Sequence, residues 1–332
     1  MILWFLTACL SPEIDYGESC ITINDGQCDE LNGCPLGSDS QDCDAACSQT
    51  PWPQEIEGAC AHDMSSMEPL SQTKPGAGSE GVGGQTGSYD GIVTVRGAYE
   101  SDLVDRHFRI YVPRRYDPAM PTPVLFVLGG FTVDMYWLAE FTEMNRLADR
   151  ENVIIVYGHP EWRDFNGTDL FAWYSYEQAY QGDWIDNPDI AYMEAIADQV
   201  KGLYNIDTDR IYVSGHSRGG ALSIIAAFER PDLFAGYCAQ AGFVTANNYL
   251  QRIRELAAVQ ITPGVLIHGD DDPDVGISES YHLSDALTES NWTYTDDWLF
   301  MVVENATHEW QSQYNQIMWD WLWNHPKNEI SP

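Results

Sequence analysis

Residues 215–219, Gly-His-Ser-Arg-Gly, place a serine in a turn where its hydroxyl group could act as a nucleophile. The apolar run 211–213 precedes the turn, and a helical pattern over residues 221–228 follows it. A serine between a strand and a helix sits on a sharp turn, and glycines two residues away let the neighbouring backbone pass close. The N-terminus of the helix directs free N–H groups at the same point. The pattern predicts that Ser217 attacks a carbonyl carbon, and an ordinary structural turn is the alternative.

A serine nucleophile needs a general base, and a histidine is the usual one. The histidines that follow Ser217 are His268, His282, His308 and His325. His308 stands between the last predicted strand and the last predicted helix, in a loop from which a side chain can reach over the edge of a sheet. We therefore predict that His308 is the base, against the alternative of a surface histidine.

An acid beside the histidine would fix its tautomer and stabilise the imidazolium. The apolar run 265–268 leads into a turn with four aspartates, which are Asp270, Asp271, Asp272 and Asp274. Most of them can simply be solvated in such a turn. The residues themselves leave the choice among the four open.

An oxyanion needs backbone N–H donors near the nucleophile. Gly129 and Gly130 follow the apolar run 124–128, so that the N–H of Phe131 or Thr132 could face the developing charge. We predict that the two donors are the backbone N–H of Phe131 and that of Arg218.

Short apolar runs alternate with helical patterns along the chain. The predicted strands cover residues 108–112, 124–128, 153–157, 211–214, 236–239, 265–268 and 299–303. The predicted helices cover residues 135–150, 190–203, 221–229, 248–256, 280–287 and 310–323. Such alternation predicts the α/β class, with a mostly parallel sheet covered by helices on both faces.

The 332 residues carry a formal net charge of −35, with 51 acidic side chains against 16 lysines and arginines. This charge excludes nucleic acid as a partner, because a phosphate backbone is bound by a basic surface. Acidic residues are spread along the whole chain, which favours a solubilising surface over an acidic interaction patch.

The N-terminal part carries six of the eight cysteines, between residues 20 and 60. Closely spaced cysteines in an acidic, loop-like segment predict disulfide bonds and an oxidising compartment. The segment resembles the small Cys-rich, Asp-rich repeats of Notch-type and related bacterial extracellular proteins. Its clustered oxygen donors make a structural Ca²⁺ site possible, with ligands Asp25, Asp29, Asp39 and Asp42. A disulfide module with solvated acids and no ion is the alternative.

Residues 6–9, Leu-Thr-Ala-Cys, resemble a bacterial lipobox, which implies cleavage and acylation at Cys9. The protein is then expected to be secreted or held on the cell envelope by a lipid anchor; a plain hydrophobic tail is the alternative. Glycine-rich residues precede residue 90 and are typical of a linker. The predicted domains are a signal and tether (1–19), a Cys-rich module (20–60), a linker (61–90) and a catalytic domain (91–332).

From about residue 108 to residue 323 the chain resembles the secreted polyhydroxybutyrate depolymerase and feruloyl esterase group of α/β-hydrolases. The resemblance is carried by residues 145–157, 204–220 and 229–235. It implies an α/β-hydrolase fold and the hydrolysis of carboxylic esters through an acyl-enzyme, with no cofactor for catalysis.

Two motifs of this group fall on candidate site residues. The His-Gly-x-x-Asp-x-x-Val pattern falls on His268, Gly269, Asp272 and Val275, which implies that Asp272 is the acid. The Gly-His-x-Trp pattern falls on Thr307, His308 and Trp310. The chain departs from the group at Gly129-Gly130, Thr307 and Arg218.

Aromatic residues crowd the stretch 162–184, and we expect Trp173, from this stretch, and Trp310 to line the substrate pocket. Packing of the aromatic residues of this stretch under a long loop, as a small separate core, is the alternative. The expected substrates are feruloyl, acetyl or other short acyl esters of polysaccharide. The alternatives are a polyhydroxybutyrate depolymerase, a peptidase on the same fold, and a non-catalytic binding protein on a hydrolase fold.

Overall fold

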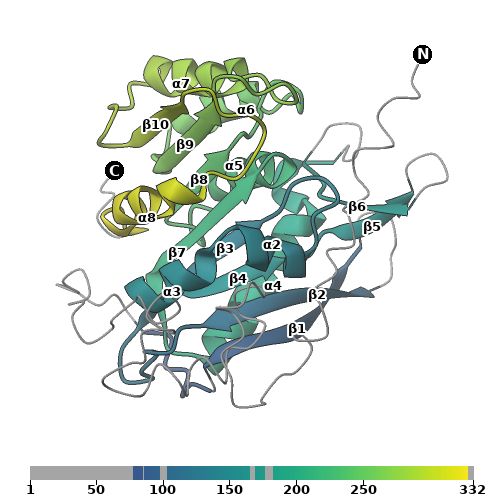
Figure 1. Cartoon of the computed structure of the whole chain (residues 1–332), viewed down its shortest axis with the longest axis vertical. Helices are drawn as coiled ribbons and strands as arrows, with labels where there is room; N and C mark the ends of the chain where they lie inside the picture. Colours follow the sequence, from purple (N-terminus) through teal and green to yellow (C-terminus); the bar gives the residue numbers. More distant parts are fainter. Residues whose placement is uncertain (1–77, 85, 98–102, 165–168, 176–181, 328–332) are drawn as a thin grey trace, which may run out of the picture. The chain divides into compact units, whose positions relative to one another are not determined.

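The computed structural model describes residues 78–84, 86–97, 103–164, 169–175 and 182–327 (Figure 1). Several predictions fall outside these residues and stay predictions: the signal, the acylated Cys9, the Cys-rich module, and the calcium ligands Asp25, Asp29, Asp39 and Asp42. Within the described residues, no helix combines the length and the apolar character needed to cross a bilayer.

The described residues form one large sheet with the strand order β1-β2-β4-β3-β7-β8-β9-β10. Its strands are β1 (Gly87–Arg96), β2 (Leu103–Val112), β3 (Thr122–Leu128), β4 (Ile154–Gly158), β7 (Ile206–His216), β8 (Gly236–Gln240), β9 (Gly264–Gly269) and β10 (Trp298–Val303). The pairs β1–β2 and β2–β4 are antiparallel, and the remaining pairs are parallel. A separate antiparallel hairpin, β5 (Glu161–Asp164) and β6 (Asp169–Ala172), follows β4.

Helices cover both faces of the large sheet, so the predicted architecture is confirmed. One face packs against α4 (Pro188–Leu203), α5 (Arg218–Glu229), α6 (Leu250–Ala257) and α7 (Ser278–Glu289). The other packs against α2 (Met135–Phe141), α3 (Met144–Glu151) and α8 (Asn315–Trp323). Every residue of β3 and β4 is buried, which fits their mostly apolar sequences.

Two predicted helices differ from the observed ones. The helix predicted over residues 135–150 is two helices, because Glu143 adopts a left-handed φ of 58° between them. The helix predicted from residue 310 begins only at Asn315. The Trp310 indole N–H donates to the Asn315 side chain, and the Gln311 N–H donates to the side chain of Gln240, so residues 310–311 are held as a loop, and a 3-10 helix, η5 (Ser312–Tyr314), precedes α8.

The N-terminal edge of the sheet begins earlier than expected. β1 starts at Gly87 and pairs with β2 along its whole length, so the boundary predicted between residues 90 and 91 falls inside a strand. Ser79 also belongs to the fold, because its hydroxyl group donates to the carbonyl groups of Lys201 and Tyr204. Glycines at both ends of this segment obscured its alternation of buried and exposed residues.

Candidate active site

Ser217 lies on the turn between β7 and α5, as the sequence predicts. Its φ of 56° and ψ of −119° are unusual for a residue with a side chain. A Cβ atom at Gly215 would lie 2.2 Å from the Gly219 carbonyl oxygen, and one at Gly219 would lie 2.2 Å from that of Leu128. Both flanking glycines are therefore required by close backbone contacts, which hold the serine at the carboxyl end of the central strands.

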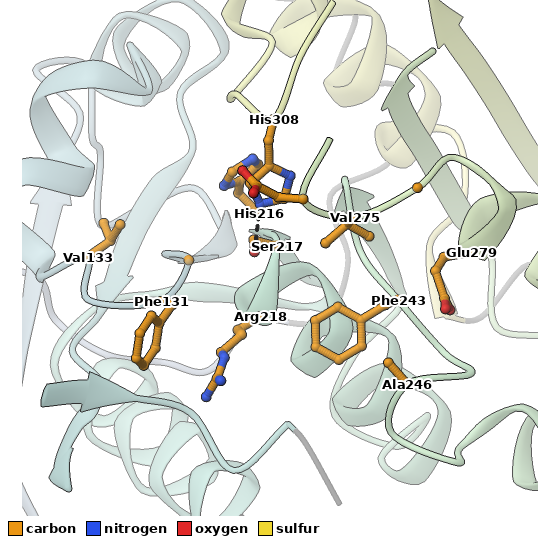
Figure 2. Close-up of a pocket in the computed structure, with 13 residues that line it drawn as sticks. Phe131, Val133, His216, Ser217, Arg218, Phe243, Ala246, Val275, Glu279 and His308 are labelled. Carbon is orange, nitrogen blue, oxygen red and sulfur yellow. Dashed lines mark hydrogen bonds between the residues drawn. The ribbon is translucent and has the colours of Figure 1, made fainter. Parts of the chain in front are cut away.

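The structure brings Ser217, His308 and Asp272 together. His308 Nδ1–H donates to Asp272 Oδ2 over 2.7 Å, which leaves Nε2 to accept the Ser217 hydroxyl proton over 2.9 Å. A carboxylate only accepts hydrogen bonds, so it fixes this tautomer of the imidazole. Figure 2 shows the serine–histidine contact as a dashed line at the head of the pocket. The arrangement is that of a serine, a base and an orienting acid.

Asp272 is held in an ionised form by its surroundings. Its Oδ1 accepts the N–H groups of Asp274 and Val275, both over 2.9 Å. Burial raises the pKa of this carboxyl group. The hydrogen bonds from His308 and from the two N–H groups outweigh burial, so that the pKa lies below its usual value. Of the four candidate aspartates, Asp272 is the one that contacts His308.

His268 also holds the turn that carries Asp272, by a hydrogen bond to the Val275 carbonyl group. It is buried, and its Nε2–H donates to the Val275 carbonyl over 2.8 Å and lies 3.4 Å from Asp272 Oδ2. Nδ1 then accepts the Ser280 hydroxyl proton over 2.7 Å. Burial lowers the pKa of His268, so the ring stays neutral and these bonds persist. The sequence marked His268 as part of a motif but did not predict this contact.

His216 is a neighbour of the site that sequence reasoning missed. Its ring lies 4.6 Å from that of His308, centroid to centroid, and it is 8% exposed. Burial, together with the nearby His308, lowers its pKa to about 3. The ring is therefore neutral when His308 becomes charged. Its place beside Ser217 at the end of β7 was the one available signal.

The loop after β3 approaches the nucleophile closely. A Cβ atom at Gly130 would lie 3.3 Å from Ser217 Cβ, so a side chain there would crowd the nucleophile. The Thr132 N–H donates to the Phe171 carbonyl over 3.0 Å, which leaves Phe131 as the candidate donor of the two. Arg218 is the first residue of α5, where a backbone N–H has no acceptor within the helix.

A cavity of about 570 Å³ opens in front of Ser217 and His308. Its wall includes Phe131, Val133, Arg218, Phe243, Ala246 and Val275. In Figure 2, His216 and His308 lie on one side of Ser217, and Phe131, Arg218 and Phe243 lie on the other. The Arg218 guanidinium group lies 4.3 Å from the centroid of the Phe131 ring, and the Phe243 ring also lines the cavity.

The prediction that Trp173 and Trp310 line this cavity is wrong. Trp173 is fully buried, and its indole N–H donates to the Gly129 carbonyl over 2.8 Å. Trp310 is 8% exposed and packs in the core beneath its own loop. The aromatic wall comes instead from Phe131 and Phe243, which lie in loops after β3 and β8 and are far apart in the sequence.

Metal ligands are not gathered at this site. Among the residues that the structure describes, no group of three or more histidine, cysteine, aspartate or glutamate side chains is placed to hold a metal ion. Cys238 is a free, buried thiol on β8, and burial raises its pKa to about 12.

Comparison with known proteins finds esterases. Residues 104–325 match the family Esterase, described as "Putative esterase". The bifunctional acetylxylan esterase/xylanase XynS20E of Neocallimastix patriciarum is 29% identical over 137 residues, which are 41% of this chain and 18% of that protein. The "Putative esterase NocK" of Nocardia uniformis subsp. tsuyamanensis is 26% identical over 160 residues, 47% of this chain and 42% of that protein. The chain thus spans less than half the length of the curated relatives it matches.

Solved structures share the fold. The ferulic acid esterase of the anaerobic fungus Anaeromyces mucronatus superposes with a TM-score of 0.52 at 20% identity, over 74% of this chain and 92% of that one. At this identity the likeness concerns the fold alone. The fold is α/β-hydrolase-like, with the predicted nucleophile on the turn after its central strand β7.

Proposed function

The chain belongs to the Esterase family, and from that premise we propose that it is a serine carboxylic-ester hydrolase. The observation that carries the proposal is the continuous hydrogen-bonded line from Asp272 through His308 to Ser217, at 2.7 and 2.9 Å. A non-catalytic binding protein would not require a strained serine, a histidine held in one tautomer and a buried, ionised acid joined by hydrogen bonds.

In the first half of the reaction, Ser217 Oγ attacks the ester carbonyl carbon while its proton passes to His308 Nε2. The carbonyl oxygen becomes an oxyanion that accepts hydrogen bonds from the backbone N–H groups of Phe131 and Arg218. Asp272 stabilises the imidazolium that has formed. The intermediate collapses, His308 gives its proton to the departing alkoxide, and the acyl group remains on Ser217.

In the second half, water takes the place of the alcohol. His308 accepts a proton from the water molecule, the hydroxide attacks the acyl carbon, and a second oxyanion forms in the same place. Collapse releases the carboxylic acid, and the proton returns to Ser217. His216 stays neutral throughout, so it places no second positive charge beside the imidazolium.

We propose acyl esters of polysaccharide as substrates, with feruloyl or acetyl as the acyl group. One relative is named an acetylxylan esterase/xylanase, and one structure of the same fold is a ferulic acid esterase. The rings of Phe131 and Phe243 and the Arg218 guanidinium offer flat surfaces to a planar aromatic acyl group. The cavity is of the size that proteins use for small ligands.

A fluorophosphonate probe and a panel of esters test this proposal. We expect Ser217 to be labelled, and methyl ferulate and p-nitrophenyl acetate to be hydrolysed. Ser217→Ala should remain folded and lose about three orders of magnitude or more in rate. A folded wild-type protein that is neither labelled nor active would favour a binding protein. Faster hydrolysis of peptide amides, or of polyhydroxybutyrate film, would reassign the substrate class.

A further inference from the structure

Two hydrogen bonds from the end of β6 hold the loop that carries the proposed oxyanion donor. The Thr132 N–H donates to the Phe171 carbonyl over 3.0 Å, and the Trp173 indole N–H donates to the Gly129 carbonyl over 2.8 Å. Phe171 lies in β6, and Trp173 follows the strand directly. One short segment therefore holds the loop on both sides of the peptide unit that carries the Phe131 N–H.

The planarity of the peptide bond makes these two bonds effective. One rigid peptide unit joins the Gly129 carbonyl to the Gly130 N–H, and another joins the Phe131 carbonyl to the Thr132 N–H. When both of these peptide units are fixed, the peptide unit between them, which carries the Phe131 N–H, has little freedom to rotate. Gly130 lies beside the nucleophile, because a Cβ atom added there would lie 3.3 Å from Ser217 Cβ. Without the bond to Trp173, the wide conformational range of glycine would let the unit turn.

Trp173 is itself firmly placed. It is fully buried, and its ring is so close to Gly158 that a Cβ atom there would lie 3.0 Å from it. The N–H of the next residue, Tyr174, donates to Asp189 Oδ2 over 2.5 Å. Asp189 Oδ1 also pairs with Arg106 over 2.7 Å, and both of these side chains are buried. A buried ion pair thus anchors the segment that holds the oxyanion loop.

We propose that Trp173 is a positioning residue for ester hydrolysis. Its indole N–H orients the backbone of residues 129–131 so that the Phe131 N–H points at the oxyanion formed when Ser217 attacks. The inference rests on the proposed esterase function. Trp173 does not line the cavity, so it acts on the transition state through the loop and not on bound substrate.

Two replacements at position 173 test this role. Trp173→Phe removes the N–H, and 3-benzothienylalanine at the same position removes it while keeping the bicyclic shape. For both, we expect kcat to fall about tenfold or more, since an oxyanion donor is misaligned and not deleted, and KM to change less than about twofold. The affinity for phenylboronic acid, whose tetrahedral serine adduct places a negative oxygen in the oxyanion site, should fall by a similar factor.

Trp292→Phe is the matched control. The Trp292 indole N–H donates to the Ala257 carbonyl over 3.0 Å, and this tryptophan is also buried, but it does not line the cavity. It should lower the melting temperature as Trp173→Phe does and leave kcat unchanged. If Trp173→Phe does not fold, kcat of the 3-benzothienylalanine variant tests the role of the indole N–H.

Several results would overturn the proposal. They are folded Trp173 variants with wild-type kcat, a rise in KM alone, and an equal loss of kcat in Trp292→Phe. A wild-type protein with neither esterase activity nor labelling of Ser217 would instead refute the proposed function on which the inference rests.

Discussion

The carboxylate of Asp272 and the backbone loop 129–132 both border the catalytic serine and histidine. The hydrogen bonds that hold the carboxylate come from nearby residues in the chain, and those that hold the loop come from distant ones. Asp272 accepts N–H groups from residues two and three positions further along the chain. The loop is held by Phe171 and Trp173, some forty residues later. The acid is therefore placed by its own turn, whereas the oxyanion loop is placed by a distant hairpin.

The two arrangements respond differently to substitution. The acid acts through one carboxylate and one contact with His308, so its replacement removes a whole function. The loop is held by several bonds, and the removal of one loosens the geometry by degrees. We therefore expect large losses on the acid side and graded losses on the side of the oxyanion loop and the cavity wall.

The largest effect is expected from Asp272→Asn. An amide at this position can donate to Nδ1 and favours the wrong tautomer of His308, so kcat should fall by about four orders of magnitude. Asp271→Asn is the control, because its side chain is exposed in the same turn. Steady-state kinetics on a p-nitrophenyl ester measures both variants. If Asp271→Asn is the inactive variant instead, Asp271 and not Asp272 is the acid that orients His308.

Asp270→Asn should have an intermediate effect. Asp270 Oδ1 accepts the Asn305 N–H over 2.6 Å and so ties the turn after β9 to the loop that carries His308. The Asn side chain keeps an oxygen that can accept this N–H but loses the charge, so the bond is weakened by part of the about 1.5–3 kcal/mol that a hydrogen bond to a charged group contributes, and kcat should fall by up to about tenfold. The rate of labelling of Ser217 by a fluorophosphonate provides a second measure. A loss as large as that of Asp272→Asn would contradict the division of roles between these aspartates.

On the cavity wall, Glu279→Gln should change binding more than chemistry. Glu279 Oε2 accepts the N–H groups of Val244 and Thr245, both over 2.8 Å, and this loop carries Phe243. Glu279 Oε1 accepts the Thr245 hydroxyl group, so both carboxylate oxygens are used, and an amide supplies only one acceptor oxygen. We expect KM for an aryl ester to rise about three- to tenfold, with kcat within about twofold. Glu289→Gln, at the exposed end of the same helix, is the control and should change neither value.

The difference between features built by neighbouring residues and features built by distant ones also explains which parts of the site the sequence could predict. The serine turn is local, and its strand, glycines and helix are adjacent in the chain. His308 followed from its place in a loop after the last strand. Asp272 could not be chosen from spacing alone, because four aspartates share one turn; a family motif was needed. The structure shows that its two local N–H bonds and its contact with His308 distinguish it.

The cavity wall could not be predicted because distant loops build it. Phe131 and Phe243 meet only after β3 and β8 are placed in the sheet. The aromatic richness around Trp173 suggested a pocket, but aromatic side chains pack in cores equally well, and Trp173 lies in the core. The break between α2 and α3 carries no glycine or proline, so the left-handed Glu143 gave no signal in the sequence.

The remaining effect is expected from His216→Asn, and it concerns stability and not the rate of catalysis. The folded protein keeps His216 neutral down to a pKa of about 3, whereas the unfolded chain binds a proton near pH 6.5. The unfolded state therefore holds more protons between these values, and stability is lost as the pH falls through this window. His308, Asp272 and His268 all act on this ring, so the comparison must be made with each of them left in place.

Urea unfolding of the wild type and of His216→Asn at pH 4.5, 5.5 and 7.5 measures this contribution. The wild-type free energy of unfolding should fall more steeply below pH 6.5, by up to about 1.4 kcal/mol per pH unit, which corresponds to one proton. Above pH 7 the difference between the two proteins should be constant. His282→Asn, exposed on α7, removes a histidine without disturbing the core and is the control. Parallel curves for the wild type and His216→Asn would mean that His216 binds a proton in the folded state as readily as in the unfolded chain, so that the site carries a second positive charge beside His308 below about pH 6.5.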